Sequence, residues 1–168
     1  EVAAGASFGG ARSFSGMKHV GLNVAADPLF TMSYIGVNAG MVIGVADDPG
    51  MHSSQNEQDS RNYAIAAKLP MLEPSDSSEC RDFTKLAYRL SEQFDTPVLL
   101  RLSTRVSHSR SIVELEDREE RPLLPYHKDP SKNVMLPVFA TKKHVVVEKR
   151  TVALAEWAET AEINRVED

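Results

Sequence analysis

The stretch Gly40–Ser60 reads GMVIGVADDPGMHSSQNEQDS, and it carries the strongest signal for the fold. Its first part, Met41–Ala46 (MVIGVA), is an unbroken apolar run rich in β-branched residues. Such a run is typical of a strand buried on both faces of a parallel sheet. The residues that follow, Asp47–Ser54, predict a turn-rich loop at the carboxyl end of that strand.

The flanking segments alternate between helical and strand patterns. Ser54 and Glu57 have the spacing of a capping box, which predicts a helix from about Gln55 to Lys68. Asp76 and Glu79 give the same signal for a second helix. The other predicted elements are a small-residue helix at Val2–Ala11, strands at Ser13–Met17, Leu69–Leu72 and Pro97–Leu102, a helix or turn at Asp27–Gly36, and an amphipathic helix at Thr141–Ala161. This alternation predicts an α/β fold, an open parallel sheet flanked by helices.

The 168 residues suit one domain followed by a tail. All nine glycines lie within residues 1–50, whereas residues 114–121 (ELEDREER) hold seven charges in eight positions. We therefore expect a main domain at residues 1–111, a charged and Pro-rich extended linker at 112–140, and a C-terminal helix at 141–168 that leads to a next domain.

Composition excludes several classes of protein. The net charge of −5 argues against a nucleic-acid binder, and no apolar stretch is long enough to span a bilayer. The single cysteine, Cys80, excludes a disulfide framework and any cluster or zinc site built from several cysteines of this chain. We expect a cytoplasmic protein, and a start at Glu1 rather than Met suggests a processed or excised piece.

Ligands of parallel α/β sheets bind beyond the carboxyl ends of the strands, so the loops Asp47–Asp59 and Ser103–Ser111 are the candidate site. The first loop precedes a predicted helix start, where backbone N–H groups favour anions. A structural role, with Ser54 as a cap and Asp47 and Asp48 in turns, explains it as well. In the second loop, SHSRS with Arg101 and Arg105 could bind an anion or form a solvated turn. The five histidines show no i, i+4 pair, so no metal site is predicted.

Four segments together resemble a known family. EVAAGASFGGARSFSGMKHVGLNVAADPL, GMVIGVADDPGMHSSQNEQDSR, AKLPMLEPSDSSE and TPVLLRLSTRVSHSRS resemble the alpha subunits of indolepyruvate ferredoxin oxidoreductases. These form a branch of the thiamine-diphosphate-dependent 2-oxoacid:ferredoxin oxidoreductases. The resemblance covers nearly the whole chain, including PYHKDPSKNVMLP and LAEWAETAEINRVED. It implies the domain that grips the aminopyrimidine of the cofactor, without its beginning.

The resemblance implies oxidative decarboxylation of arylpyruvates, such as indolepyruvate, to aryl-acetyl-CoA with ferredoxin as electron acceptor. The implied cofactors of the full enzyme are thiamine diphosphate, Mg²⁺ and 4Fe–4S clusters on other domains, with CoA as co-substrate. The implied partners are the remaining domains of the alpha subunit, a beta subunit and ferredoxin. The chain alone should be inactive. The alternative is a non-catalytic α/β binding or interaction domain derived from the same scaffold.

The resemblance also implies roles for particular residues. The glutamate that activates the cofactor falls about five residues before Glu1, so no catalytic residue is assigned in this chain. Pyruvate-specific relatives carry an arginine where Asp47 and Asp48 stand, which fits a different 2-oxoacid. The residues expected to bind the cofactor or face the cleft are Lys18, His19, His52, Ser53, Ser54, Gln55, Gln58 and Asp59. His19 replaces an expected glutamine.

An interface between domains implies one further expectation. A domain that normally pairs with a partner would expose apolar surface, so we expect self-association. The residues expected at or near that contact are Leu22, Leu29, Phe30 and Tyr34. The other interpretation is that these side chains fill the core of the chain itself.

Overall fold

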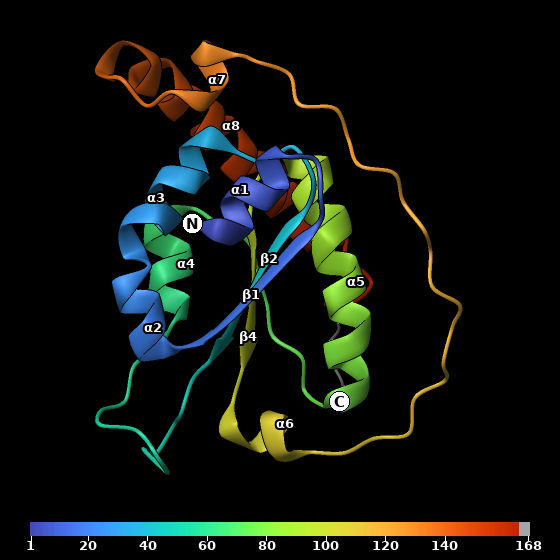
Figure 1. Cartoon of the computed structure of the whole chain (residues 1–168). Coiled ribbons are helices and arrows are strands. Elements are labelled where there is room, and N and C mark those ends of the chain that lie inside the picture. Colours follow the sequence, from blue (N-terminus) through green and yellow to red (C-terminus); the bar gives the residue numbers. More distant parts are fainter. Residues whose placement is uncertain (165–168) are drawn as a thin grey trace.

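Four parallel strands form one open sheet at the centre of the molecule (Figure 1). The computed structural model describes residues 1–164, and its strand order is β1-β2-β4-β3. The strands are β1 at Ser13–Lys18, β2 at Met41–Ala46, β3 at Met71–Leu72 and β4 at Val98–Leu102. All three strand pairings are parallel. The predicted α/β class with an open parallel sheet is therefore confirmed.

Helices cover both faces of the sheet, which explains why β2 is apolar along its whole length (Figure 1). Side chains alternate between the two faces of a strand. Ile43 and Val45 pack into the core cluster under the first four helices, whereas Val42 packs into the cluster under the fifth. The helices of the first face are α1 (Val2–Phe8), α2 (His19–Val24), α3 (Ala26–Ile35) and α4 (Arg61–Ala67), and α5 (Ser77–Phe94) covers the second.

The helix predicted to begin at Gln55 begins six residues later. α4 starts at Arg61, with Ser60 as its N-cap residue. The Ser54 hydroxyl does not cap a helix, because it bonds to the side chains of Asp48 and Lys18 instead. By contrast, Asp76 caps α5 by accepting a hydrogen bond from the backbone N–H of Glu79, as predicted.

The C-terminal helix packs against the main body of the chain. α8 (Pro137–Thr160) begins four residues before the predicted start, because Pro137 occupies its first turn. The guanidinium of Arg150 is buried against α3 and donates to the backbone oxygens of Ser33 and Asp95. Trp157 packs against the core cluster under α5. The division at residue 111 stays a prediction, and residues 165–168 of the last predicted segment lie outside the described part.

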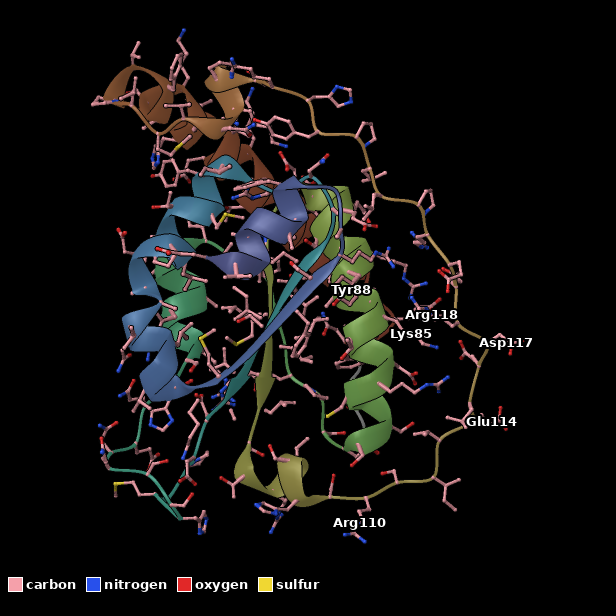
Figure 2. All side chains as sticks on the ribbon, in the orientation of Figure 1. Lys85, Tyr88, Arg110, Glu114, Asp117 and Arg118 are labelled. Atoms are coloured by element: carbon pink, nitrogen blue, oxygen red, sulfur yellow. The ribbon has the colours of Figure 1, made fainter. Side chains whose placement is uncertain are left out.

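A long segment without helix or strand, residues 109–129, runs past the outside of α5 (Figure 1). We call it the strap. Glu116 pairs with Arg81 and Lys85 of α5, and the Leu124 N–H donates to the Gly10 carbonyl at 3.0 Å. Figure 2 shows Lys85 reaching from α5 toward the strap. The strap leads to a short helix, α7 (Pro130–Asn133), so the predicted linker is not extended throughout.

Two of the four residues expected at a self-association contact lie in the core of the chain. Leu22 is 0% exposed and Leu29 is 3% exposed, and both belong to the core cluster on the α1–α4 face. The expectation was wrong for this pair, because α2 and α3 turn both side chains toward the sheet. Phe30 is 38% exposed, and the Tyr34 hydroxyl lies 2.9 Å from Nδ1 of His144 on α8.

Strand β1 forms one edge of the sheet within the described residues. Its alternate residues Phe14, Gly16 and Lys18 are exposed, and Phe14 is 50% exposed. Gly16 lies opposite Gly44 of β2, so two neighbouring strands lack a side chain at the same level. Among residues 1–164, no helix is long and apolar enough to cross a membrane.

Candidate functional site

The carboxyl ends of three neighbouring strands meet at one edge of the sheet, at the bottom of Figure 1. Lys18 is the last residue of β1, Asp47 follows β2, and Ser103 follows β4. The loop after β2 and the short helix α6 (Thr104–His108) both lie at this edge (Figure 1). The prediction that the loop Asp47–Asp59 lies at the carboxyl end of the sheet is therefore confirmed.

Asp48 holds this loop together from inside. The residue is 2% exposed, and its carboxylate accepts bonds from the backbone N–H groups of His52 (3.1 Å) and Ser53 (2.8 Å). It also accepts from the hydroxyls of Thr104 and Ser54, each at 2.7 Å. These donors, Thr104 foremost, hold the pKa of Asp48 well below its usual range, because they stabilise the charged form. Asp48 thus does more than form a turn.

Asp47 fastens the start of the loop to the neighbouring strand. Its carboxylate is fully buried and accepts a hydrogen bond from Nε of Arg101 on β4 at 2.6 Å. The same carboxylate accepts from the backbone N–H and the hydroxyl of Ser60, the N-cap residue of α4. Arg101 also pairs with Glu73 at 3.1 Å, and Glu73 in turn bonds to Arg61. The hydrogen bond from Arg61 is the main reason that the pKa of Glu73 is lowered.

Lys18 and His19, which follow one another at the end of β1, lie in different surroundings. The Lys18 ammonium donates to the Ser54 hydroxyl oxygen at 2.7 Å and to the Ser53 carbonyl at 3.3 Å, so β1 also contacts the loop. His19 is 1% exposed, and neither of its ring nitrogens has a hydrogen-bond partner within residues 1–164. An unpartnered buried imidazole is rare in proteins, so the His19 ring keeps hydrogen-bonding capacity that the described residues leave unused.

The other loop residues differ in how closely they follow the prediction. His52, Ser53 and Gln55 are exposed. A helix that begins near Gln55 would place Gln58 and Asp59 on its first turn, but α4 begins only at Arg61, so both residues lie in the loop before it. Instead, the Gln58 amide donates to the Asn56 side chain, and Asp59 accepts from the backbone N–H of Arg61.

The second candidate loop contributes in a way that the sequence did not suggest. Arg101, considered there for anion binding, forms ion pairs with Asp47 and Glu73. Thr104 donates a hydrogen bond to Asp48 that sequence reasoning missed. The register of the sheet carried a signal for that contact: Ala46 lies opposite Leu102, so positions 48 and 104 continue side by side. Within the part of the chain that the structure describes, no group of three or more His, Cys, Asp or Glu residues could hold a metal ion.

Comparison with known proteins matches this arrangement to one class. Residues 1–167 match the family model described as pyruvate flavodoxin/ferredoxin oxidoreductase, thiamine diphosphate-binding. The class defined by the fold and the match is thus a thiamine-diphosphate-binding α/β domain. The chain belongs to the pyruvate flavodoxin/ferredoxin oxidoreductase family, a family of oxidoreductases.

Relatives within the family have a more specific name. The chain is 50% identical over 167 residues to the indolepyruvate oxidoreductase subunit IorA of Methanothermobacter thermautotrophicus, covering 99% of this chain. It is 45% identical over 170 residues to the subunit of that name from Archaeoglobus fulgidus, covering 100% of this chain. In each case it spans only 27% of the relative's length. The resemblance inferred from the sequence segments is confirmed.

The residues at the carboxyl edge fit the polar part of a cofactor such as thiamine diphosphate. The buried His19 ring has two nitrogens without partners within the described residues, and the exposed His52 and Ser53 lie on the loop that Lys18 contacts. These groups can form hydrogen bonds with a heterocycle or an anion. The chemistry of the residues therefore agrees with the family match.

Proposed function

We propose that this chain forms the aminopyrimidine side of the thiamine-diphosphate cleft in an oxidoreductase that oxidatively decarboxylates indolepyruvate and related arylpyruvates. The support for the substrate is the name shared by the relatives. The observation that supports the site is the polar loop at the carboxyl edge of the sheet. Hydrogen bonds from the ends of β1 and β2 and from the β4–α6 junction hold this loop in place. The activating glutamate is proposed to come from a position before Glu1.

The residues divide into those that hold the site and those that contact the ligand. Asp47 and Asp48 are already saturated by protein donors, so they shape the loop. Lys18, His19, His52 and Ser53, with Ser54, Gln55, Gln58 and Asp59 on the same loop, are the proposed contacts of cofactor or substrate. When bound, thiamine diphosphate supplies the nucleophilic carbon that cleavage beside a 2-oxo group requires.

The remaining parts of the reaction belong to other parts of the enzyme. We propose that Mg²⁺ and the cofactor diphosphate are bound by a partner domain, and that 4Fe–4S clusters on other domains pass electrons to ferredoxin. CoA accepts the acyl group in this scheme. The proposed partners, in the cytoplasm, are the other alpha-subunit domains, a beta subunit and ferredoxin, and the chain alone is proposed to self-associate.

The proposal is tested on the full-length enzyme assembled with its partner subunit. We expect reduction of methyl viologen with indolepyruvate and CoA that depends on added thiamine diphosphate. His52→Ala should lower kcat/KM, whereas Asp82→Asn on the exposed surface of α5 should leave it unchanged. The isolated 168-residue chain should give no reduction above a blank without protein. A cofactor-loaded enzyme that oxidises no arylpyruvate would contradict the proposal.

A further inference from the structure

The ammonium of Lys18 is fixed in position but not neutralised. Its two hydrogen bonds go to neutral oxygens, the Ser54 hydroxyl at 2.7 Å and the Ser53 carbonyl at 3.3 Å. Within the described residues it forms no ion pair, and the residue is exposed at the carboxyl edge of the sheet. An ammonium has three N–H donors, so one remains available to a ligand.

The direction of these hydrogen bonds is set by Asp48. The Ser54 hydroxyl donates its single proton to the buried Asp48 carboxylate at 2.7 Å. Its oxygen can then only accept, and it accepts from Lys18. Because Thr104 and the backbone of His52 also bind this carboxylate, the acceptor for Lys18 is held by the rigid part of the fold.

The loop that receives Lys18 has an unusual backbone. Gly50 has a φ of 81° and Met51 a φ of 53°, so two consecutive residues are left-handed. A left-handed residue other than glycine is sterically unfavourable. Such strain persists where the surrounding contacts determine the conformation, which is typical of binding loops. The Asp48 bonds to His52 and Ser53 are the contacts that do so here.

The other cations near this edge are less suited to bind an anion. Arg61 and Arg101 are both paired with Glu73, and Arg101 also with the buried Asp47. Arg105 on α6 is exposed, and within residues 1–164 no side-chain contact fixes its guanidinium. Lys18 alone among these four combines a free donor with a fixed position.

We propose that Lys18 binds the carboxylate of the 2-oxoacid substrate, with Ser54 and Asp48 as positioning residues for its ammonium. This inference rests on the proposed function, because it names the substrate contact within the same site. A phosphate oxygen of the cofactor offers the same anionic chemistry, so the experiment must separate these two sources. The carboxylate is favoured because the proposed function assigns the cofactor diphosphate and its Mg²⁺ to a partner domain, and within residues 1–164 no group of three or more His, Cys, Asp or Glu residues could hold a metal ion.

The test uses the full-length enzyme and two probes, indolepyruvate and the unreactive carboxylate indole-3-propionate. Loss of a charge-assisted hydrogen bond corresponds to about 10- to 100-fold in binding. Lys18→Met should therefore raise the KM for indolepyruvate and the inhibition constant of indole-3-propionate by that factor. The inhibition constant of the neutral indole-3-propionamide and the dissociation constant of thiamine diphosphate should stay within about threefold. Lys18→Arg should recover most of the loss.

Further variants separate positioning from a general structural effect. Ser54→Ala should raise the same KM by a smaller factor, and Ser54→Thr, which keeps the hydroxyl, should restore it. The control is Lys149→Met on the exposed surface of α8, which should change none of these constants. The proposal is overturned if Arg105→Gln, rather than Lys18→Met, raises the KM for indolepyruvate. It is also overturned if Lys18→Met weakens only the binding of thiamine diphosphate. A wild-type enzyme that does not turn over indolepyruvate would instead refute the proposed function.

Discussion

Replacing Arg101 by methionine should destabilise the chain more than replacing its partner Asp47 by asparagine. The Asp47 side chain is 0% exposed and that of Arg101 is 10% exposed, so the pair is almost fully desolvated. Arg101→Met leaves a buried carboxylate without a counter-charge, which costs about 3–5 kcal/mol. Asp47→Asn keeps an acceptor for Ser60, and Arg101 retains Glu73. Asp47→Asn should therefore lower the free energy of unfolding by about the worth of one charged hydrogen bond, about 1.5–3 kcal/mol.

The double variant makes the test sharper. With both charges removed, no buried ion is left alone, so the combined loss should be smaller than the sum by about 1–3 kcal/mol. Urea unfolding at pH 7, followed by circular dichroism and by the fluorescence of the single Trp157, gives the three free energies. For a urea slope of about 1–3 kcal/mol/M, the loss of about 3–5 kcal/mol in Arg101→Met should lower the midpoint by about 1–5 M. Equal single effects that simply add would refute the reasoning.

Four other variants test the core, the strap and the pH dependence. Leu22→Ala should cost about 2–5 kcal/mol in urea unfolding, and Phe30→Ala less than about 1 kcal/mol; the reverse order would favour a core role for Phe30. Glu116→Gln should speed proteolytic cleavage within the strap without changing the urea midpoint, and unchanged cleavage would show that its ion pairs do not hold the strap. Because the pKa of Glu73 is lowered from 4.5 in the folded chain, its contribution is present above about pH 4.5 and is lost as the pH falls further. Glu73→Gln should flatten the acid-side decline in unfolding free energy, and an unchanged decline would contradict this assignment.

Local sequence patterns predicted those parts of the fold that depend on local physics. Met41–Ala46 and Pro97–Leu102 identify the two central strands because both faces of each are buried, and Asp76 identifies the start of α5 because its cap lies three residues away. The same capping pattern failed at Ser54. Its hydroxyl oxygen accepts a hydrogen bond from Lys18, 36 positions away in the sequence, instead of capping a helix. Periodicity within a helix cannot reveal such a contact.

The location of the candidate site was predictable from the sequence, but its hydrogen-bond network was not. The topology of a parallel sheet put the Asp47–Asp59 loop at the carboxyl edge. Which residues contact ligands and which only shape the loop depended on burial. Asp48 looks like a turn residue in the sequence, and only its neighbour across the sheet, Thr104, shows it to be an internal anchor. Leu22 and Leu29 likewise could face a partner or the sheet until the direction of α2 and α3 was known.

The open edge of β1 has a practical consequence for preparing this chain in isolation. A strand whose outer N–H and C=O groups are free can template the addition of strands from other molecules. The half-exposed Phe14 and the exposed Gly16 are neighbours on one face of β1, and the strand carries no charge before Lys18. It therefore has little of the protection that charges, prolines or bulges give to sheet edges. Aggregation of the isolated chain should therefore begin at β1, and Ser15→Lys or Phe14→Lys should raise the concentration at which it stays in solution.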